Sequence, residues 1–145
     1  MQESNIEILV VEDREDDIIA LREAFKRARV LNPVQNATSG REALDLLLVD
    51  RPGRRRPDIV FLDLGLPDIS GIEVLQEIRR EDELANLPVV VLTVSNSDED
   101  ILRSYDLGVK AFIQKPVLPD NLLDVLLGEP SFGLVFKVLD ESGSD

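Results

Sequence analysis

The chain has 145 residues, a length typical of one domain, with no cysteine, no histidine and a formal net charge of −13 at pH 7. Without cysteine and histidine it cannot form disulfides, thiolate metal sites or a histidine general base, so any chemistry must use carboxylates, hydroxyls, lysine or arginine. The negative charge disfavours contact with DNA or anionic membranes, and we find neither a membrane-spanning run nor a signal peptide, which favours a cytoplasmic protein.

Short apolar runs alternate five times with segments in which apolar residues recur at helical spacing. In chain order, we predict a strand at 6–11, a helix at 16–28, a strand at 34–37, a helix at 41–49, a strand at 59–62, a helix around 72–78, a strand at 89–92, a helix at 98–107, a strand at 111–113 and a helix at 120–127. This alternation predicts an α/β domain with a parallel sheet and helices on both faces.

We assign residues 1–128 to this one domain and residues 129–145 to a C-terminal extension. Apolar residues at alternating positions between 132 and 138 predict a strand in the extension, and its Ser/Gly/Asp tip is expected to be disordered. Two arrangements stay open for the strand, because such a segment is unlikely to lie free in water. It folds back onto its own domain, or it forms a dimerisation arm across a two-fold homodimer, which we favour.

Polar side chains stand where the predicted strands end. Glu12 and Asp13 follow the first strand, Asp63 the third, Thr93 the fourth and Lys115 the fifth. The carboxyl ends of the strands form the ligand-binding edge of an open α/β sheet, so these residues are expected to converge. Three carboxylates would raise one another's pKa there, and a hard cation such as Mg²⁺ would relieve the repulsion.

These residues together can support phosphoryl transfer. An aspartate carboxylate can attack phosphorus and form an aspartyl phosphate, provided that the phosphoryl oxygens are neutralised. Asp63 is the candidate acceptor, Lys115 the neutralising ammonium and Thr93 the hydroxyl that hydrogen-bonds a phosphoryl oxygen. Singly, each residue has an ordinary interpretation as a cap, a surface lysine or a strand-end threonine, and the coincidence at several strand ends favours a site.

The same residues carry a family resemblance. The set of Glu12-Asp13, Asp63, Thr93 and Lys115-Pro116, with its spacing, resembles the receiver domains of two-component response regulators. The resemblance covers about residues 6–128 and includes the stretches LDLGLPDISG at 62–71, VVLT at 90–93 and GVKAFIQKP at 108–116. It implies a flavodoxin-like, doubly wound (βα)5 fold with the parallel strands in the order 2-1-3-4-5.

The resemblance also implies a Mg²⁺ site. Asp13 and Asp63 would be direct ligands together with the backbone carbonyl of Gly65, and Glu12 would act through water. Glu12 stands where many members of the family have aspartate, and its longer arm should still reach a metal-bound water. Gly65 has no side chain where many members carry a larger one, so the dephosphorylation rate is not predicted.

Three further roles follow from the resemblance. Lys115 would pair with the phosphoryl group on Asp63, and Thr93 and Phe112 would be the switch residues that respond to it. A core phenylalanine explains Phe112 equally well. The Lys115–Pro116 peptide bond is expected to be cis. The protein would then be a signalling phosphoacceptor that catalyses only its own phosphorylation and dephosphorylation, not an enzyme in the usual sense.

The implied partner is a sensor histidine kinase, which would dock largely on the helix at 16–28. We expect no output domain after the last helix, so the signal would pass to a downstream protein or a histidine phosphotransfer protein. The 50–57 loop, the missing output domain and the extension resemble the small regulators that accompany bacterial and cyanobacterial phytochromes. A phytochrome is therefore the expected kinase, and a generic histidine kinase is the broader expectation.

Three other functions were weighed. A flavodoxin-like FMN module would need a glycine- and hydroxyl-rich phosphate loop after the first strand, where this chain has EDREDD at 12–17. An aspartyl-phosphate phosphatase would need a second aspartate two residues after Asp13, where Glu15 stands. A non-phosphorylated pseudo-receiver scaffold is the remaining alternative, and the intact set of site residues disfavours it.

Overall fold

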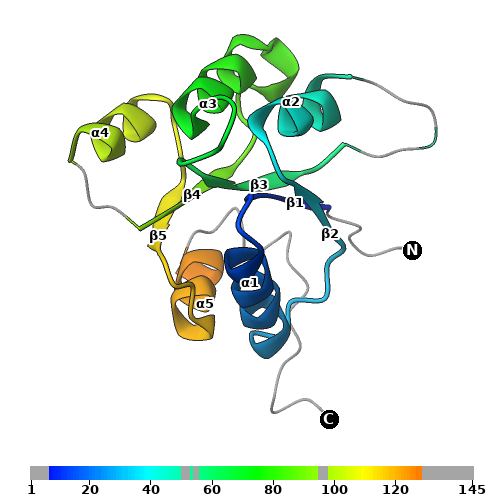
Figure 1. The fold of residues 1–145 in the computed structure, drawn as a ribbon, viewed down its shortest axis with the longest axis vertical. Helices are drawn as coiled ribbons and strands as arrows, with labels where there is room; N and C mark the ends of the chain where they lie inside the picture. The colour runs from blue at the N-terminus through cyan, green and yellow to red at the C-terminus, as the bar shows by residue number, and fades with distance from the viewer. Residues whose placement is uncertain (1–6, 50–52, 54–55, 95–97, 129–145) are drawn as a thin grey trace.

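The computed structural model describes residues 7–49, 53, 56–94 and 98–128, in which strands and helices alternate along the chain (Figure 1). The strands are β1 (Ile8–Val11), β2 (Val34–Ala37), β3 (Ile59–Asp63), β4 (Val89–Thr93) and β5 (Ala111–Gln114). The helices are α1 (Glu15–Arg27), α2 (Gly40–Leu48), α3 (Gly71–Arg80), α4 (Asp98–Asp106) and α5 (Pro119–Gly128). Every predicted element within these ranges is present, and a short 3-10 helix, η1 (Asp82–Leu84), is added.

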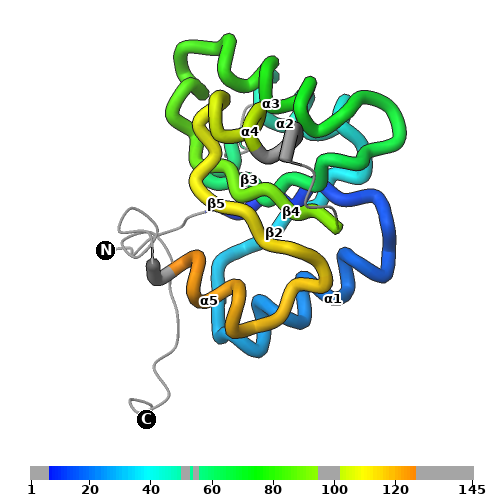
Figure 2. Tube along the Cα trace, turned by 90° about the vertical axis from the view of Figure 1, so that its left-hand side faces the viewer, coloured from blue at the N-terminus to red at the C-terminus, as the bar shows by residue number. Residues whose placement is uncertain are grey.

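The five strands form one parallel sheet in the order β2-β1-β3-β4-β5, which confirms the predicted doubly wound topology. Helices α1 and α5 cover one face of the sheet, and α2, α3 and α4 cover the other (Figures 1 and 2). Because both faces are covered, strands β1 and β3 are buried along their whole length, as expected for a parallel sheet.

Successive side chains of each strand enter two separate apolar cores. In β1, Ile8 and Val10 pack on the side of α1 and α5, whereas Leu9 and Val11 pack on the side of α2 and α3. Each fully buried aliphatic side chain of this kind contributes about 1.5 to 3 kcal/mol relative to an exposed one. The two cores therefore hold the strand ends, and with them the polar residues that follow, in fixed positions.

Side-chain and backbone contacts fix the start of α3 against the end of β3. Ser70 caps the helix and accepts a hydrogen bond from the Glu73 N–H, while the Glu73 carboxylate accepts one from the Ser70 N–H. A Cβ on Gly71 would lie 2.6 Å from the carbonyl oxygen of Asp63 and equally close to Cα of Leu64. Only glycine allows this approach, which places α3 directly behind the last residue of β3.

The β3–α3 loop is tied to the start of α2. The helix begins at Gly40, slightly earlier than predicted, because the Ser39 side chain accepts a hydrogen bond from the Glu42 N–H at 3.0 Å. The Asp68 carboxylate accepts two further bonds, from the N–H groups of Gly40 at 2.9 Å and Arg41 at 3.0 Å. These bonds, that of Gly40 foremost, lower the pKa of Asp68 to about 2.

Arg79, near the end of α3, binds only backbone carbonyls among its hydrogen-bond partners described here. Its guanidinium donates to the carbonyls of Leu107 (2.6 Å), Gly108 (3.2 Å), Leu84 (3.1 Å) and Leu87 (2.8 Å). These carbonyls belong to the end of α4 and to the segment around η1. Arg79 thus joins three parts of the chain on one side of the sheet.

The predictions for the 50–57 loop and for the extension fall largely on residues that the structure does not describe. Most of the 50–57 loop and the whole extension at 129–145 lie outside the described ranges, so the extension strand and dimerisation arm stay predictions. The same holds for the domain boundary at residue 128. Within the described residues, no helix has both the length and the apolar composition needed to cross a membrane.

Candidate functional site

The residues chosen from the sequence meet at one edge of the sheet. Glu12 and Asp13 follow β1, Asp63 ends β3, Thr93 ends β4, and Lys115 follows β5. The parallel register sets the strand ends level, because Asp63 stands opposite Leu92 and Thr93 opposite Gln114. A cleft of about 410 Å³ opens at this edge, and it is lined by Arg14, Asp17, Asp63, Leu64, Gly65, Thr93, Val94 and Lys115.

Three carboxylates gather beside the cleft. Glu12, Asp13 and Asp63 each offer an oxygen, and these oxygens all lie within 4.8 Å of one another. Glu12 is only 1% exposed and Asp63 only 6%, so their charges are poorly solvated. A hard divalent cation such as Mg²⁺ prefers this all-oxygen donor set, and the arrangement therefore fits a metal site.

Gly65 leaves the mouth of the cleft open. Its N–H donates to Oδ1 of Asp63 at 3.3 Å, and no atom beyond its two chain neighbours lies within 4 Å of the point where a Cβ would stand. Because Gly65 has no side chain, it leaves Asp63 open to approach by both a phosphoryl donor and water. The departure from the family pattern noted in the sequence has its structural counterpart here.

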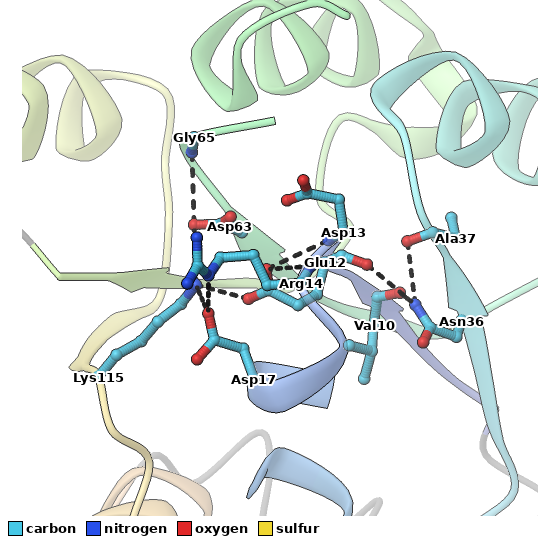
Figure 3. Close-up of polar contacts among 10 residues, drawn as sticks. All are labelled: Val10, Glu12, Asp13, Arg14, Asp17, Asn36, Ala37, Asp63, Gly65 and Lys115. Carbon is cyan, nitrogen blue, oxygen red and sulfur yellow. Dashed lines mark hydrogen bonds and ion pairs between the residues drawn. The ribbon is translucent and has the colours of Figure 1, made fainter. Parts of the chain in front are cut away.

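The Lys115 side chain, 6% exposed, brings its ammonium among three carboxylates (Figure 3). Nζ lies 2.6 Å from Oε2 of Glu12, 3.0 Å from Oδ2 of Asp17 and 3.2 Å from Oδ1 of Asp63. The contact with Glu12 is a close ion pair, and the contact with Asp17 is also a hydrogen bond. One buried ammonium is thus shared by the candidate phosphoacceptor and two other acidic side chains.

Burial and charge act in opposite directions on this cluster. Burial raises the pKa of Glu12, the negative charge of Asp63 adds to the rise, and the contact with Lys115 offsets only part of it. Burial acts to lower the pKa of Lys115, but the contacts with Glu12 and Asp17 and the charge of Asp63 outweigh it and raise the pKa. The predicted repulsion is confirmed for Glu12, although burial is the larger cause.

The two predicted switch residues lie in different places. Thr93 is half-buried and lines the cleft together with Asp63 and Lys115. Phe112 is half-buried in β5 and does not line the cleft; its ring packs edge-to-face on Tyr105 of α4, with centroids 4.9 Å apart. The Lys115–Pro116 peptide bond is cis, as the resemblance implied.

Sequence reasoning missed two residues of the site, Arg14 and Asp17. Arg14 precedes α1 and forms an ion pair with Asp17 in the first turn, Nε to Oδ2 at 3.5 Å. Asp17 also accepts a hydrogen bond from Lys115, the last of the predicted site residues along the chain. The available signal was the acidic run from Glu12 to Asp17, which brings Asp17 near the predicted ligand-binding edge but does not specify its partner.

Comparison with known proteins identifies the class. The family model of the response regulator receiver domain matches residues 8–127, and the chain belongs to this family. Receiver domains are signalling phosphoacceptors rather than conventional enzymes. In sequence, the chain is 40% identical over 116 residues to the probable methanogenesis regulatory protein FilR2 of Methanothrix harundinacea, covering 79% of this chain and 75% of FilR2. It is 33% identical over 129 residues to the response regulator Rcp1 of Synechocystis sp., covering 88% of each protein.

Similar solved structures include response regulators that accompany phytochromes. The bacteriophytochrome response regulator AtBRR superimposes with a TM-score of 0.79 and 36% identity, covering 96% of this chain and 99% of that one. The phosphorylated cyanobacterial phytochrome response regulator RcpA gives 0.73 and 36%, covering 86% and 91%. The Mn²⁺-bound form of Rcp1 gives 0.73 and 34%, covering 89% and 94%.

Proposed function

We propose that this chain is a single-domain response regulator that receives a phosphoryl group on Asp63 from a sensor histidine kinase. The signal then passes on through protein contacts or a phosphorelay. One observation carries the proposal: buried Asp63 lies 3.2 Å from the buried ammonium of Lys115 and within a cluster of three carboxylates. This combination supports roles for Asp63 as the nucleophile, for the carboxylate cluster as the metal-binding set and for Lys115 as the counter-charge.

In the proposed transfer, a carboxylate oxygen of Asp63 forms a bond to phosphorus as the bond from phosphorus to the donor's imidazole nitrogen breaks. The electron pair of the broken bond stays on that nitrogen, which takes up a proton. Lys115 donates a hydrogen bond to one phosphoryl oxygen, and the Thr93 hydroxyl donates to another. These bonds exist only in the phosphorylated state, so they favour a second position of Thr93. Because β4 pairs with β5, the change would also reach Phe112.

Mg²⁺ is the proposed cofactor, and when bound it neutralises charge on the phosphoryl oxygens. Asp13 and Asp63 would hold it directly together with the backbone carbonyl of Gly65, and Glu12 would hold it through water. The cluster of carboxylate oxygens supports this set, as does the Mn²⁺-bound form of the similar protein Rcp1.

A phytochrome is the proposed histidine kinase. The similarity to AtBRR and RcpA, both described as phytochrome response regulators, supports this pairing. Helix α1 begins beside the cleft and exposes 59% of Ile19, an apolar side chain that suits a helix-to-helix contact with a kinase. We assign the protein to the cytoplasm, where such a kinase domain would meet it.

A homodimer through the extension is also part of the proposal. Alternating apolar residues at 132–138 support an arm that is covered by a second copy, and the boundary of the receiver domain would lie at residue 128. On the described part of the chain, α4 exposes 64% of Leu102 and 55% of Tyr105, which gives this face apolar area for a protein contact. The downstream partner would be a protein or a histidine phosphotransfer protein.

The test is phosphorylation by acetyl phosphate with Mg²⁺, measured by intact mass. We expect the wild type to gain one phosphoryl group, Asp63→Asn to gain none, and chelation of Mg²⁺ to stop the reaction. Asp16→Asn is the matched control, because it makes the same change at an exposed residue of α1. If the wild type gained no label and also bound no beryllofluoride in native mass spectrometry, the pseudo-receiver scaffold would replace this proposal.

A further inference from the structure

Asp17 is the partner of Lys115 that neither the sequence pattern nor the proposed transfer uses. It lies in the first turn of α1, and its Oδ2 accepts a hydrogen bond from Nζ of Lys115 at 3.0 Å. This contact joins residues 98 positions apart in the chain, across the end of the sheet. Figure 3 shows Asp17 reaching the ammonium from the side of α1, with Asp63 on the opposite side.

The three carboxylates around Lys115 differ in what else they must bind. Glu12 and Asp63 belong to the cluster of oxygens within 4.8 Å of one another, whereas Asp17 does not belong to it. A cation bound by that cluster would compete with Lys115 for Glu12 and Asp63. Asp17 would then be the one of the three that still holds the ammonium.

We propose that Asp17 is a positioning residue for phosphoryl transfer, which holds the Lys115 ammonium beside Asp63 while Glu12 and Asp63 bind the metal. This inference rests on the proposed function. It makes the start of α1 a part of the phosphoacceptor site. It also separates two duties, because one group of carboxylates binds metal and a single outlying carboxylate aims the lysine.

Two simpler explanations of Asp17 are less well supported by the contacts. The first is its pair with Arg14, but that pair is longer, at 3.5 Å, and the Arg14 side chain is 70% exposed, so water screens it. The second is stabilisation of the N-terminus of α1 by negative charge. Glu15 and Asp16 supply charge to the same turn, so a helix-dipole role would not distinguish Asp17 from Asp16.

The test compares Asp17→Asn with the matched control Asp16→Asn in phosphorylation by acetyl phosphate at saturating Mg²⁺. We expect the maximal rate of Asp17→Asn to fall about tenfold, because a misplaced lysine no longer meets the phosphoryl oxygens. Mere loss of negative charge near the cleft would instead favour entry of the anionic donor and raise the rate. Asp16→Asn reports that general effect, so the two explanations predict changes of opposite sign.

Two further measurements separate positioning from damage to the fold. The Mg²⁺ affinity of Asp17→Asn, measured by calorimetry, should match that of the wild type, since Asp17 is not in the metal cluster. Asp17→Glu keeps the charge within reach of Lys115 and should recover most of the rate. Thermal unfolding checks that the variants fold, and Asp17→Ser, which also removes the charge, replaces Asp17→Asn if that variant does not.

The outcomes are distinct. If the wild type is not phosphorylated on Asp63, the proposed function fails, and this inference fails with it. If the wild type is phosphorylated and Asp17→Asn reacts as fast as Asp16→Asn, only the positioning role is overturned. A slow Asp17→Asn with equally weakened Mg²⁺ binding would also overturn it, because Asp17 would then act on the metal.

Discussion

Lys115 and Arg79 are both largely withdrawn from water, yet the protein holds them in contrasting ways. Lys115 is surrounded by three carboxylates, which a metal or a phosphoryl group can claim or replace. Arg79 is surrounded by four backbone carbonyls, which have no other state to adopt. Side chains with exchangeable partners therefore lie at the edge of the sheet where we propose phosphoryl transfer, whereas side chains with fixed partners hold the helices and loops in place.

The largest effect should come from removing the ammonium of Lys115, whose partners can be exchanged. Lys115→Met should slow phosphorylation by acetyl phosphate by about 100-fold, because one donor to the developing phosphoryl charge is lost. Mg²⁺ should bind this variant more tightly than the wild type, since a competing cation has left the carboxylates. Time-resolved intact mass and calorimetry measure the two quantities. A near-normal rate would contradict the contrast with Arg79.

Removing the guanidinium of Arg79, whose partners are fixed, should lower the stability of the fold instead. Arg79→Met should lower the free energy of unfolding by about 3 kcal/mol, because several part-buried carbonyls lose a charged donor at once. Its phosphorylation rate, measured well below the unfolding midpoint, should stay unchanged. Arg80→Met is the matched control, because Arg80 is exposed and pairs only with Glu77 among its contacts described here. Urea unfolding measures both variants, and a slow reaction in Arg79→Met would show that the contacts of Arg79 and the site are not separable.

Mg²⁺ binding provides a second way to compare the carboxylate cluster with Arg79. Mg²⁺ at ten times its dissociation constant should raise the free energy of unfolding by about 1.4 kcal/mol, by mass action on the folded state. Asp13→Asn should lose most of this stabilisation by Mg²⁺. Arg79→Met should keep it, although its free energy of unfolding without Mg²⁺ is lower than that of the wild type. Thermal or urea unfolding with and without Mg²⁺ provides the measurement. Equal gains in wild type and Asp13→Asn would argue against the proposed ligand set.

The smallest effect concerns Asp68, a carboxylate with fixed partners. Because its pKa falls from 3.8 to about 2 on folding, the carboxylate stabilises the protein above pH 3.8, and that contribution is lost as the pH falls through about 2. Urea unfolding of the wild type and Asp68→Asn between pH 5 and pH 2 tests this. The difference in free energy of unfolding between the wild type and Asp68→Asn should become smaller as the pH falls over that range. A difference that stays constant down to pH 2 would assign the stabilisation to shape rather than charge.

Much of this architecture was predictable because it follows from periodicity. The apolar runs of β1, β3 and β4 have no other stable place than the middle of a covered sheet. Parallel strands end at a common edge, so the sequence predicts that Asp13, Asp63 and Thr93 converge. The sequence also pointed to the lysine, since Lys115 follows the last strand, β5, which ends at Gln114.

The rest depended on side-chain directions and on contacts with the backbone. Asp17 meets Lys115 only because α1 begins at Glu15 and turns that residue toward the cleft, which a pattern of charges does not specify. The four partners of Arg79 are carbonyls, which every residue has, so the sequence holds no signal for them. Phe112 could not be placed either, because an aromatic residue in an edge strand can face the site or a helix with equal ease.

The pairing of Tyr105 with Phe112 has a practical consequence. The chain has one tyrosine and no tryptophan, so its tyrosine emission arises at a single position, Tyr105. That position lies on α4 against the ring of β5, away from the cleft that would receive the phosphoryl group. The protein therefore carries its own optical probe at the proposed output side. A change in tyrosine emission when Asp63 is phosphorylated would show, without any label, that the event at one end of the sheet reaches α4.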